Sequence, residues 1–296
     1  MPELPEVEVI RRGLAPRLRG RRFNGVAEGP HRLRRQSPAP DFSRWLPGRR
    51  VLDLRRRGKY LLLDLEGGAT LLFHLGMTGR LLLTPGPPPP LPHVHLTFRL
   101  EGGLALLFQD VRRFGQALIF PPGMDLTPLE QVGREPLSPQ VTARRLAKMA
   151  RGRFRPLKNF LLDGRIMAGI GNIYASEIMF AARLHPAAPV GSLSPADWRR
   201  LLRHTRRILR AAIARGGTTI NDYLDSHGRT GLFQLDLLVY GRHGEACRKC
   251  GAAIERLNQG GRSTFFCPCC QTPGAEQGRE GRPDGACDAP FDNVSK

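Results

Sequence analysis

The first residues of the chain could supply a nucleophile and a proton carrier. Methionine before proline is normally removed, which would give Pro2 a free secondary amine. An α-amino group has a pKa near ~8, so a useful fraction is unprotonated and nucleophilic at neutral pH. Its attack on a sugar C1′ would form an iminium ion, and the adjacent Glu3 could transfer protons there. The alternative is that Pro2 and Glu3 only begin a helix.

A second group of reactive residues is a set of four cysteines near the C-terminal end. They form two pairs, Cys247-x2-Cys250 and Cys267-x2-Cys270, with sixteen residues between the pairs. This spacing is typical of a zinc site with four cysteine ligands. Four thiolates leave no open coordination position, so we predict one structural Zn²⁺. Cys269 could replace Cys270 only by breaking the two-residue spacing.

The charge of the chain indicates a polyanionic partner. Lys and Arg number 46 against 26 Asp and Glu, a formal charge of +20, and nucleic acid is the first expectation. A genome bias toward arginine is the alternative, because Gly and Pro are also frequent. The sequence has no apolar stretch long enough to cross a membrane, and six cysteines do not suggest a disulfide scaffold at this length. We therefore expect a protein of the reducing cytoplasm.

Two kinds of element must position these residues. Apolar residues recur every three or four positions from Glu3 to Leu18, as one buried helix face requires. Short apolar runs follow, and Glu-Gly-Gly turns at 66–68 and 101–103 join some of them, which is the pattern of hairpins in a sandwich or barrel. The predicted strands are Val51–Leu54, Tyr60–Leu65, Thr70–Leu75, Val94–Leu100, Leu104–Phe108 and Gln116–Phe120.

The pattern becomes helical after about Pro121, with predicted helices at roughly 139–150, 172–182 and 195–215. Beyond Gln271 the chain is Gly-rich and polar, which predicts disorder and makes Cys287 an incidental thiol. We predict an α+β fold. Its parts are a strand-rich N-terminal domain at 1–130, a helical domain at 131–235, a zinc finger at 236–271 and a disordered tail at 272–296.

Eight sequence blocks, in consistent order from Pro2 to about Gln271, resemble the formamidopyrimidine-DNA glycosylase family. The resemblance implies that 1–130 is a catalytic β-sandwich with a leading helix, that 131–235 is a DNA-binding domain with a helix–two-turns–helix motif, and that the zinc finger follows. The blocks are Pro2-Glu-Leu-Pro-Glu6, Arg57-Gly-Lys-Tyr60, His74-Leu-Gly-Met-Thr-Gly79, Asp110 with Arg112-Arg-Phe-Gly115, Gly169-Ile-Gly-Asn-Ile-Tyr-Ala175, Gly216-Gly-Thr-Thr219, Val239-Tyr-Gly-Arg242 and the finger.

The resemblance also implies roles for two cations. Lys59 matches the family lysine that donates a proton in β-elimination, although a solvated cation at a strand end is the alternative. Arg262, between the two cysteine pairs, matches the arginine that grips phosphates beside the extruded nucleotide and is linked to δ-elimination.

Three further residues match those that fill the hole left in the duplex when a nucleotide is extruded. Extrusion costs base stacking, which an aromatic wedge partly restores, while an arginine can satisfy the orphaned base. These residues are Met77, Arg112 and Phe114. Without the resemblance, Met77 and Phe114 would more often be core residues.

The remaining DNA contacts are also expected from the resemblance. Asn172 resembles a helix N-cap whose free amides face a phosphate, with an ordinary cap as the alternative. His93 and Arg153 are expected to contact the DNA backbone, and the segment from Thr218 to about Phe233 corresponds to a loop that closes over the damaged base.

The chain departs from the family pattern at two positions in this region. Val111 stands where the family usually has proline, which could loosen the loop that carries Arg112. His95 stands where an acidic residue is common, and the proline-rich segment before His93 makes the alignment there uncertain.

The resulting hypothesis is a bifunctional glycosylase and lyase that excises 8-oxoguanine and formamidopyrimidines from double-stranded DNA, acting as a monomer in bacterial cytoplasm at the nucleoid. Pro2 would form a Schiff base, followed by β- and δ-elimination. One alternative resembles endonuclease VIII, which acts on oxidised pyrimidines, but Leu4 argues against it because that branch tends to have glycine there. Another is a noncatalytic lesion-binding protein, against which Pro2, Glu3 and Lys59 argue.

Overall fold

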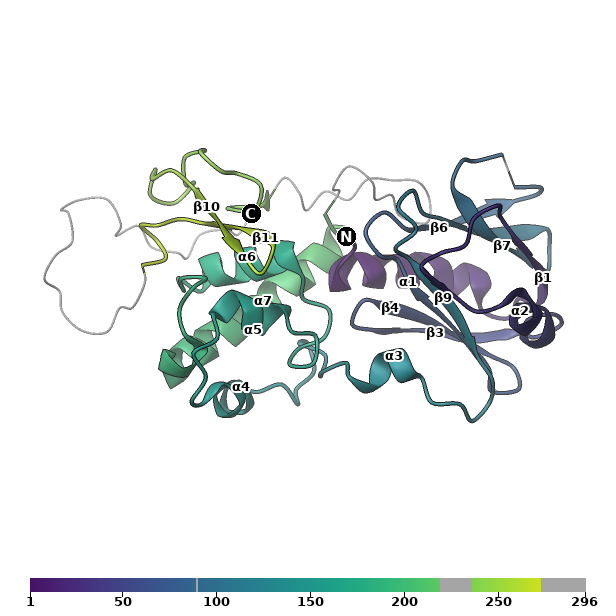
Figure 1. Ribbon diagram of the computed structural model, residues 1–296, viewed down its shortest axis with the longest axis horizontal. Helices are drawn as coiled ribbons and strands as arrows, with labels where there is room; N and C mark the ends of the chain where they lie inside the picture. The colour runs from purple at the N-terminus through teal and green to yellow at the C-terminus, as the bar shows by residue number, and fades with distance from the viewer. Residues whose placement is uncertain (89, 219–235, 273–296) are drawn as a thin grey trace, which may run out of the picture. The chain divides into compact units, whose positions relative to one another are not determined.

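The computed structural model describes residues 1–88, 90–218 and 236–272 (Figure 1). Its contacts divide the chain into two compact units. The first unit holds residues 1–132 and the segment from Arg210, and the second holds residues 133–209 and the segment from Asp236. Within the described residues no helix has the length and apolar character needed to cross a membrane.

The first unit begins with helix α1, Leu4–Leu18, which the sequence periodicity predicts. Val7, Ile10 and Leu14 lie on its buried side. A capping box forms at its start: the Glu3 side chain accepts from the Glu6 amide, and the Glu6 side chain accepts from the Glu3 amide. Two amides that the helix itself cannot satisfy are thereby paired.

Two antiparallel-rich sheets form the body of the first unit. One has strand order β1-β7-β8-β6, and the other has order β2-β9-β5-β4-β3 with β2 parallel to β9. The strands are β1 Phe23–Glu28, β2 Arg35–Gln36, β3 Val51–Arg57, β4 Tyr60–Leu65, β5 Thr70–His74, β6 Arg80–Pro85, β7 Val94–Leu100, β8 Leu104–Gln109 and β9 Gln116–Phe120. Two short helices, α2 Ala39–Trp45 and α3 Thr127–Glu130, complete it.

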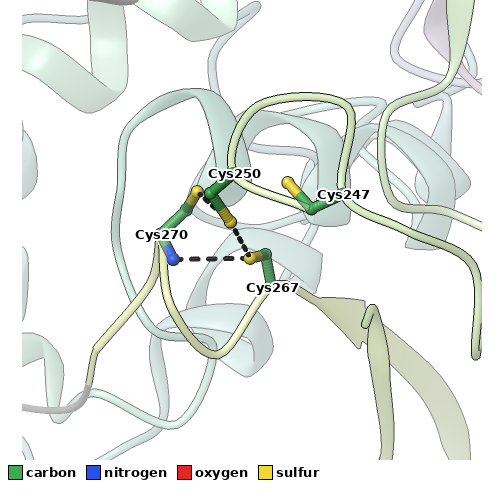
Figure 2. A group of neighbouring side chains, drawn as sticks. All are labelled: Cys247, Cys250, Cys267 and Cys270. Carbon is green, nitrogen blue, oxygen red and sulfur yellow. Dashed lines mark hydrogen bonds between the residues drawn. The ribbon is translucent and has the colours of Figure 1, made fainter. Parts of the chain in front are cut away.

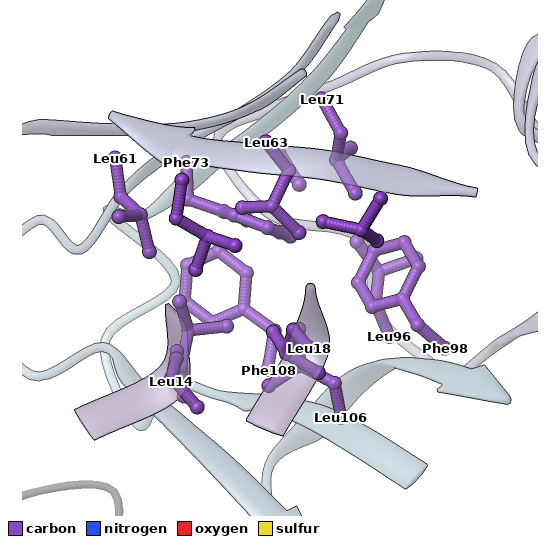
Figure 3. Close-up of a cluster of buried hydrophobic side chains, with 14 of the residues drawn as sticks. Leu14, Leu18, Leu61, Leu63, Leu71, Phe73, Leu96, Phe98, Leu106 and Phe108 are labelled. Carbon is purple, nitrogen blue, oxygen red and sulfur yellow. The ribbon is translucent and has the colours of Figure 1, made fainter. Parts of the chain in front are cut away.

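The core of the first unit lies between the inner faces of the two sheets (Figure 3). Phe73 of β5 meets Phe98 and Phe108 of the other sheet edge to face, with ring centroids 5.5 and 5.7 Å apart. Leu14 and Leu18 of α1 add to the same cluster. This is a β-sandwich with a leading helix, because one apolar face of each sheet is buried against the other.

The second unit is helical and ends in a small two-stranded sheet. It contains α4 Ala143–Ala150, α5 Leu157–Leu162, α6 Asn172–Ala181, the 3-10 turn Val190–Ser192, most of α7 Pro195–Ala214, and the hairpin strands β10 Glu255–Gln259 and β11 Arg262–Phe266. Helix α6 packs against both α5 and β11, and its residues 173–181 are all buried. The helical domain and the finger therefore share a core around α6.

Most predicted elements are confirmed, and the three-part fold is as expected. The predicted limits of β4, β7 and β9 agree with the structure, and the helix predicted from about 139 begins instead at Ala143, with Thr142 as its N-cap. The sequence patterns missed the strands β1, β2 and β6 and the short helices α2, α3 and α5. The loop expected from Thr218 to about Phe233 lies outside the described residues from position 219, and so do the tail from position 273 and Cys287.

Candidate active site and zinc finger

The carboxylate of Glu6 helps to hold the N-terminal residues in place. Pro2 and Glu3 are buried, and Met1 before them is 37 % exposed. Glu6 Oε2 accepts from the Glu3 amide at 2.8 Å, and Glu6 Oε1 accepts from the Thr218 amide and hydroxyl at 2.9 and 3.1 Å. All of these residues belong to the first unit. Glu6 thus links the backbone beside the candidate nucleophile to Thr218, a residue distant in the sequence.

Lys59 lies in the tight turn between β3 and β4, where Arg57 pairs with Tyr60. The first turn residue is Gly58 with φ 58°, and a positive φ at this position is typical of a two-residue hairpin. The positive charge of Lys59 acts on His74 at the end of β5. Burial, and secondarily Lys59, lowers the pKa of His74 to about 4. His74 is therefore neutral at neutral pH, with Nδ1 accepting from the Gly76 amide at 3.1 Å.

Asp110 organises the loop that carries Arg112. Its carboxylate is fully buried, accepts from the Gly115 amide at 2.7 Å and from the Arg112 amide at 3.3 Å, and also binds the Thr78 hydroxyl. The Thr78 hydroxyl in turn accepts from the Arg112 amide at 3.1 Å. Residues 110–115 form what we call the reading loop. The Asp110 carboxylate therefore helps to set the shape of this loop.

The predicted gap-filling residues are exposed rather than buried in the core. Met77 is 41 % exposed and Phe114 is 38 % exposed. The guanidinium groups of Arg112 and Arg34 lie 4.8 and 5.7 Å from the Phe114 ring centroid. Large apolar side chains left exposed next to cations are suited to a partner that carries both bases and phosphates. The alternative core role for Met77 and Phe114 does not fit this exposure.

The two predicted backbone-contact residues lie in different units. His93 is exposed next to the reading loop, where its carbonyl accepts from the Asp110 amide at 2.9 Å. Arg153 is exposed in the second unit, in the segment between α4 and α5. The next residue, Phe154, is 90 % exposed.

The four predicted cysteine ligands come together in the second unit (Figure 2). The sulfur atoms of Cys247, Cys250, Cys267 and Cys270 all lie within 4.8 Å of one another. A tetrahedral zinc ion with Zn–S bonds of about 2.3 Å needs sulfurs about 3.8 Å apart, so this cluster fits one structural Zn²⁺. Burial raises the pKa of the Cys267 thiol to about 11, which a bound cation would reverse. Cys270, not Cys269, completes the set.

The finger presents Arg262 at the end of a tight hairpin. Gln259 pairs with Arg262, and the two turn residues Gly260 and Gly261 have φ values of 58° and 71°. Positive φ at both positions defines a type I′ turn, which glycine adopts without strain. Arg262 itself is exposed.

Lys158, which the sequence analysis did not single out, supports this hairpin. It is fully buried on α5, and its Nζ donates to the Ser263 carbonyl at 2.9 Å and to the Thr264 hydroxyl at 2.6 Å. Burial, and secondarily Arg262, lowers the pKa of Lys158 to about 8. Lysine occurs only five times in the sequence, so its rarity was the one signal that could have marked Lys158.

The expectation that Asn172 caps a helix is wrong. The N-cap of α6 is Gly171, and Asn172 is the first helical residue. Its side-chain amide instead donates to the Ser263 carbonyl at 2.9 Å, the same oxygen that Lys158 binds. The reason is tertiary: the finger hairpin packs over the start of α6 and brings the Ser263 carbonyl within reach of the Asn172 side chain. Asn172 therefore helps to hold the arginine-bearing hairpin.

A buried carboxylate also ties the finger to α6. Glu177 accepts from the amides of Leu238, Val239 and Tyr240 at 2.9 to 3.0 Å. Burial raises the pKa of Glu177, although the three amides oppose this effect. The second unit thus contains the zinc cluster, Arg262, Lys158, Asn172 and Arg153. The other candidate residues lie in the first unit.

Three models of known protein families together match most of the chain. Residues 1–117 match the formamidopyrimidine-DNA glycosylase N-terminal domain, residues 132–223 match the H2TH domain of the same glycosylase, and residues 244–273 match the zinc finger found in FPG and IleRS.

Individual relatives match over their full length. The chain is 45 % identical over 271 residues to the formamidopyrimidine-DNA glycosylase of Acidithiobacillus ferrooxidans and 44 % identical to that of Pseudomonas aeruginosa, with 92 % of this chain and 100 % of each relative covered. The crystal structure of the MutM (Fpg) protein from Thermus thermophilus is 42 % identical with a TM-score of 0.83, again covering 92 % and 100 %. A Lactococcus lactis FPG mutant in complex with Fapy-dG-containing DNA is 32 % identical, with a TM-score of 0.85 and the same coverage.

Proposed function

The chain belongs to the formamidopyrimidine-DNA glycosylase family, and we propose that Pro2, Glu3, Lys59 and Arg262 carry out its reaction. The protein is a bifunctional DNA glycosylase and AP lyase that acts on oxidised purines. The observation that carries the proposed residue assignment is the buried start of α1, where Glu6 binds both the Glu3 amide and Thr218.

The first half of the reaction replaces the damaged base with the enzyme. Once Met1 is removed, the unprotonated Pro2 nitrogen attacks C1′, the bond from C1′ to the base breaks, and the base leaves with a proton. Glu3 donates the proton that opens the sugar ring at O4′, which leaves an iminium ion at C1′. Pro2 has no second nitrogen proton to lose, so the iminium keeps its charge and draws electrons from C2′.

The second half removes the sugar. Loss of a proton from C2′ expels the 3′ phosphate, with Lys59 as the proposed proton donor, and loss of a proton at C4′ expels the 5′ phosphate with help from Arg262. Hydrolysis of the iminium then frees Pro2. A one-nucleotide gap with phosphates at both ends results. The four-cysteine zinc site has no open position and supports the finger that presents Arg262.

The proposed DNA contacts follow from exposure and charge. Met77 and Phe114 would enter the space left by the extruded nucleotide, and Arg112 would satisfy the orphaned base. His93 and Arg153 would bind phosphates, while Asn172 would act through the finger hairpin. Lactococcus lactis relatives were crystallised with Fapy-dG-containing and abasic-site DNA, which supports damaged DNA as the substrate here.

We propose that the enzyme acts as a monomer on duplex DNA in the bacterial cytoplasm, where its chromosomal substrate lies. We also propose that the chain divides into domains at residues 1–130, 131–235 and 236–271, followed by a tail at 272–296.

Borohydride trapping tests the proposed nucleophile. Incubation with an 8-oxoguanine duplex and borohydride is expected to give a covalent protein–DNA adduct. Peptide mapping should locate the attached DNA on Pro2. An adduct at a lysine would contradict the assignment. A thymine glycol duplex is tested in parallel, and the excision rates of the two lesions are compared. This comparison is needed because a Lactococcus lactis relative was also crystallised with oxidised-pyrimidine DNA. We expect the purine to be the faster substrate.

A further inference from the structure

His95 makes two contacts that constrain its protonation. It lies on β7 and is 3 % exposed. Its Nδ1 is 2.7 Å from the His31 carbonyl oxygen, and its Nε2 is 2.8 Å from the Asp110 carbonyl oxygen. Both distances are those of good hydrogen bonds.

Both of these oxygens can only accept a hydrogen bond, so both ring nitrogens of His95 must donate. A neutral imidazole carries one N–H, and its other nitrogen would face a carbonyl oxygen lone pair to lone pair. Only the imidazolium, protonated on both nitrogens, satisfies both contacts. His95 contacts the backbone carbonyl of Asp110, whose own side chain is also buried. The neighbouring segments also carry Glu28, His31 and His93.

The peptide that His95 binds lies at a strained part of the backbone. His93 and Arg113 have φ values of 62° and 57°, which residues other than glycine rarely adopt. Both bind Asp110 through the backbone: the Asp110 amide donates to the His93 carbonyl, and the Arg113 amide donates to the Asp110 carbonyl. Strained backbone persists only where other interactions hold it.

The side chain that follows Asp110 does not provide that hold. Val111, the next residue, is 59 % exposed, and a valine leaves φ free where a proline would fix it. The Asp110 carboxylate accepts hydrogen bonds from the amides of Arg112 and Gly115, which follow the Asp110–Val111 peptide in the chain. The hydrogen bond from His95 Nε2 acts on the carbonyl of that peptide itself.

We propose that His95, as a buried imidazolium, is the positioning residue that fixes the Asp110–Val111 peptide and so determines how well the enzyme distinguishes the base opposite the lesion. His95 acts through the reading loop and does not touch DNA. The inference rests on the proposed role of Arg112 as the residue that contacts the opposite base.

A spectroscopic test addresses the protonation directly. In the full-length, zinc-loaded protein labelled with ¹⁵N-histidine, the His95 ring is expected to show two protonated nitrogens, each with its own N–H coupling, at neutral pH. Loss of these signals in His95→Gln assigns them. A spectrum with one unprotonated His95 nitrogen overturns the proposal.

A kinetic test addresses the function. Single-turnover excision of 8-oxoguanine opposite cytosine and opposite adenine is compared for wild type, His95→Gln and His95→Leu, with cleavage of an abasic site as an internal measure of Pro2 chemistry. The ratio of the two excision rates is expected to fall about five- to tenfold, the effect of one lost hydrogen bond, while abasic-site cleavage stays unchanged. The proposal is overturned if the ratio of the two excision rates is unchanged, or if base excision and abasic-site cleavage fall by the same factor.

Two controls separate the possible failures. His31→Gln keeps the carbonyl that His95 binds and changes only an exposed side chain, so its rate ratio should equal that of wild type. Arg112→Ala tests the premise. If Arg112→Ala abolishes opposite-base preference and His95→Gln does not, His95 lacks the proposed role; if Arg112→Ala leaves the preference intact, the role assigned to Arg112 is the part that fails.

Discussion

The carboxylate of Glu6 binds Thr218, a residue 212 positions away in the sequence, while its second oxygen holds the Glu3 amide at 2.8 Å. Glu6 is 2 % exposed, so its three described hydrogen bonds form away from water. Gly217 has φ 81°, and a Cβ there would lie 2.9 Å from Glu6 Oε1. The contact thus couples the start of α1 to the segment that follows α7.

Glu6→Gln should slow covalent trapping of an abasic-site duplex about tenfold. The substitution replaces one acceptor oxygen with a donor that faces either the Glu3 or the Thr218 amide, and an unmet buried amide costs about 1 to 3 kcal/mol. Trapping rates at saturating enzyme provide the measurement. Glu66→Gln, an exposed glutamate in a surface ion pair with Arg22, is the matched control. Equal rates for Glu6→Gln and wild type would refute the positioning role.

A noncleavable tag before Pro2 should abolish base release, because it converts the proposed nucleophile into an amide. We expect at least a hundredfold loss of adduct, with affinity for an 8-oxoguanine duplex within about twofold of wild type. Electrophoretic trapping and fluorescence anisotropy measure the two quantities. The same tag after Lys296 serves as the control. Persistent base release in the N-terminally tagged protein would exclude Pro2.

Glu8 should stabilise the protein near neutral pH and lose this effect in acid. Burial would raise its pKa, but hydrogen bonds from Arg11 and Arg12 outweigh burial and lower it to about 2 from 4.5. Because the folded pKa lies below the unfolded one, the stabilisation is complete above about pH 4.5 and disappears as the pH falls through 2.

Glu8→Gln is therefore expected to lower the free energy of unfolding by about 2 kcal/mol at pH 7, a value reduced from the full pKa difference because Arg12 is largely exposed. The difference from wild type should shrink between pH 4.5 and pH 2 in urea titrations. Glu101→Gln, at an exposed position, should show no such pH dependence. A difference that stays constant down to pH 2 would contradict the ion-pair explanation.

Lys158→Met should loosen the finger hairpin. It removes the donor to the Ser263 carbonyl and the Thr264 hydroxyl, which costs about 1 to 3 kcal/mol. We expect zinc release to a chelator to accelerate about tenfold, and the share of product that has undergone δ-elimination to fall. Lys148→Met, on the exposed side of α4, is the control. Wild-type zinc release in Lys158→Met would show that this lysine does not support the finger.

Local sequence patterns predicted those elements and ligands that show a regular spacing of residues along the chain. Short apolar runs predicted β4, β7 and β9, the three-to-four periodicity predicted α1, and the cysteine spacing predicted the zinc cluster. The six-residue α5 was missed because it is too short for a helical period to emerge. β1 was missed because only one of its six residues is buried, which leaves no apolar run.

The sequence alone determined the leading helix, the main strands and the metal ligands, and its resemblance to a known family is the basis for the chemistry proposed for Pro2. Only the tertiary structure decided which buried polar groups hold these parts in place: Glu6 at Thr218, Asp110 and His95 at the reading loop, and Lys158 and Asn172 at Ser263. Their partners lie far apart in sequence or in loops. Periodicity reports only which face of an element is buried, whereas a hydrogen bond depends on where a single atom lies in the folded chain.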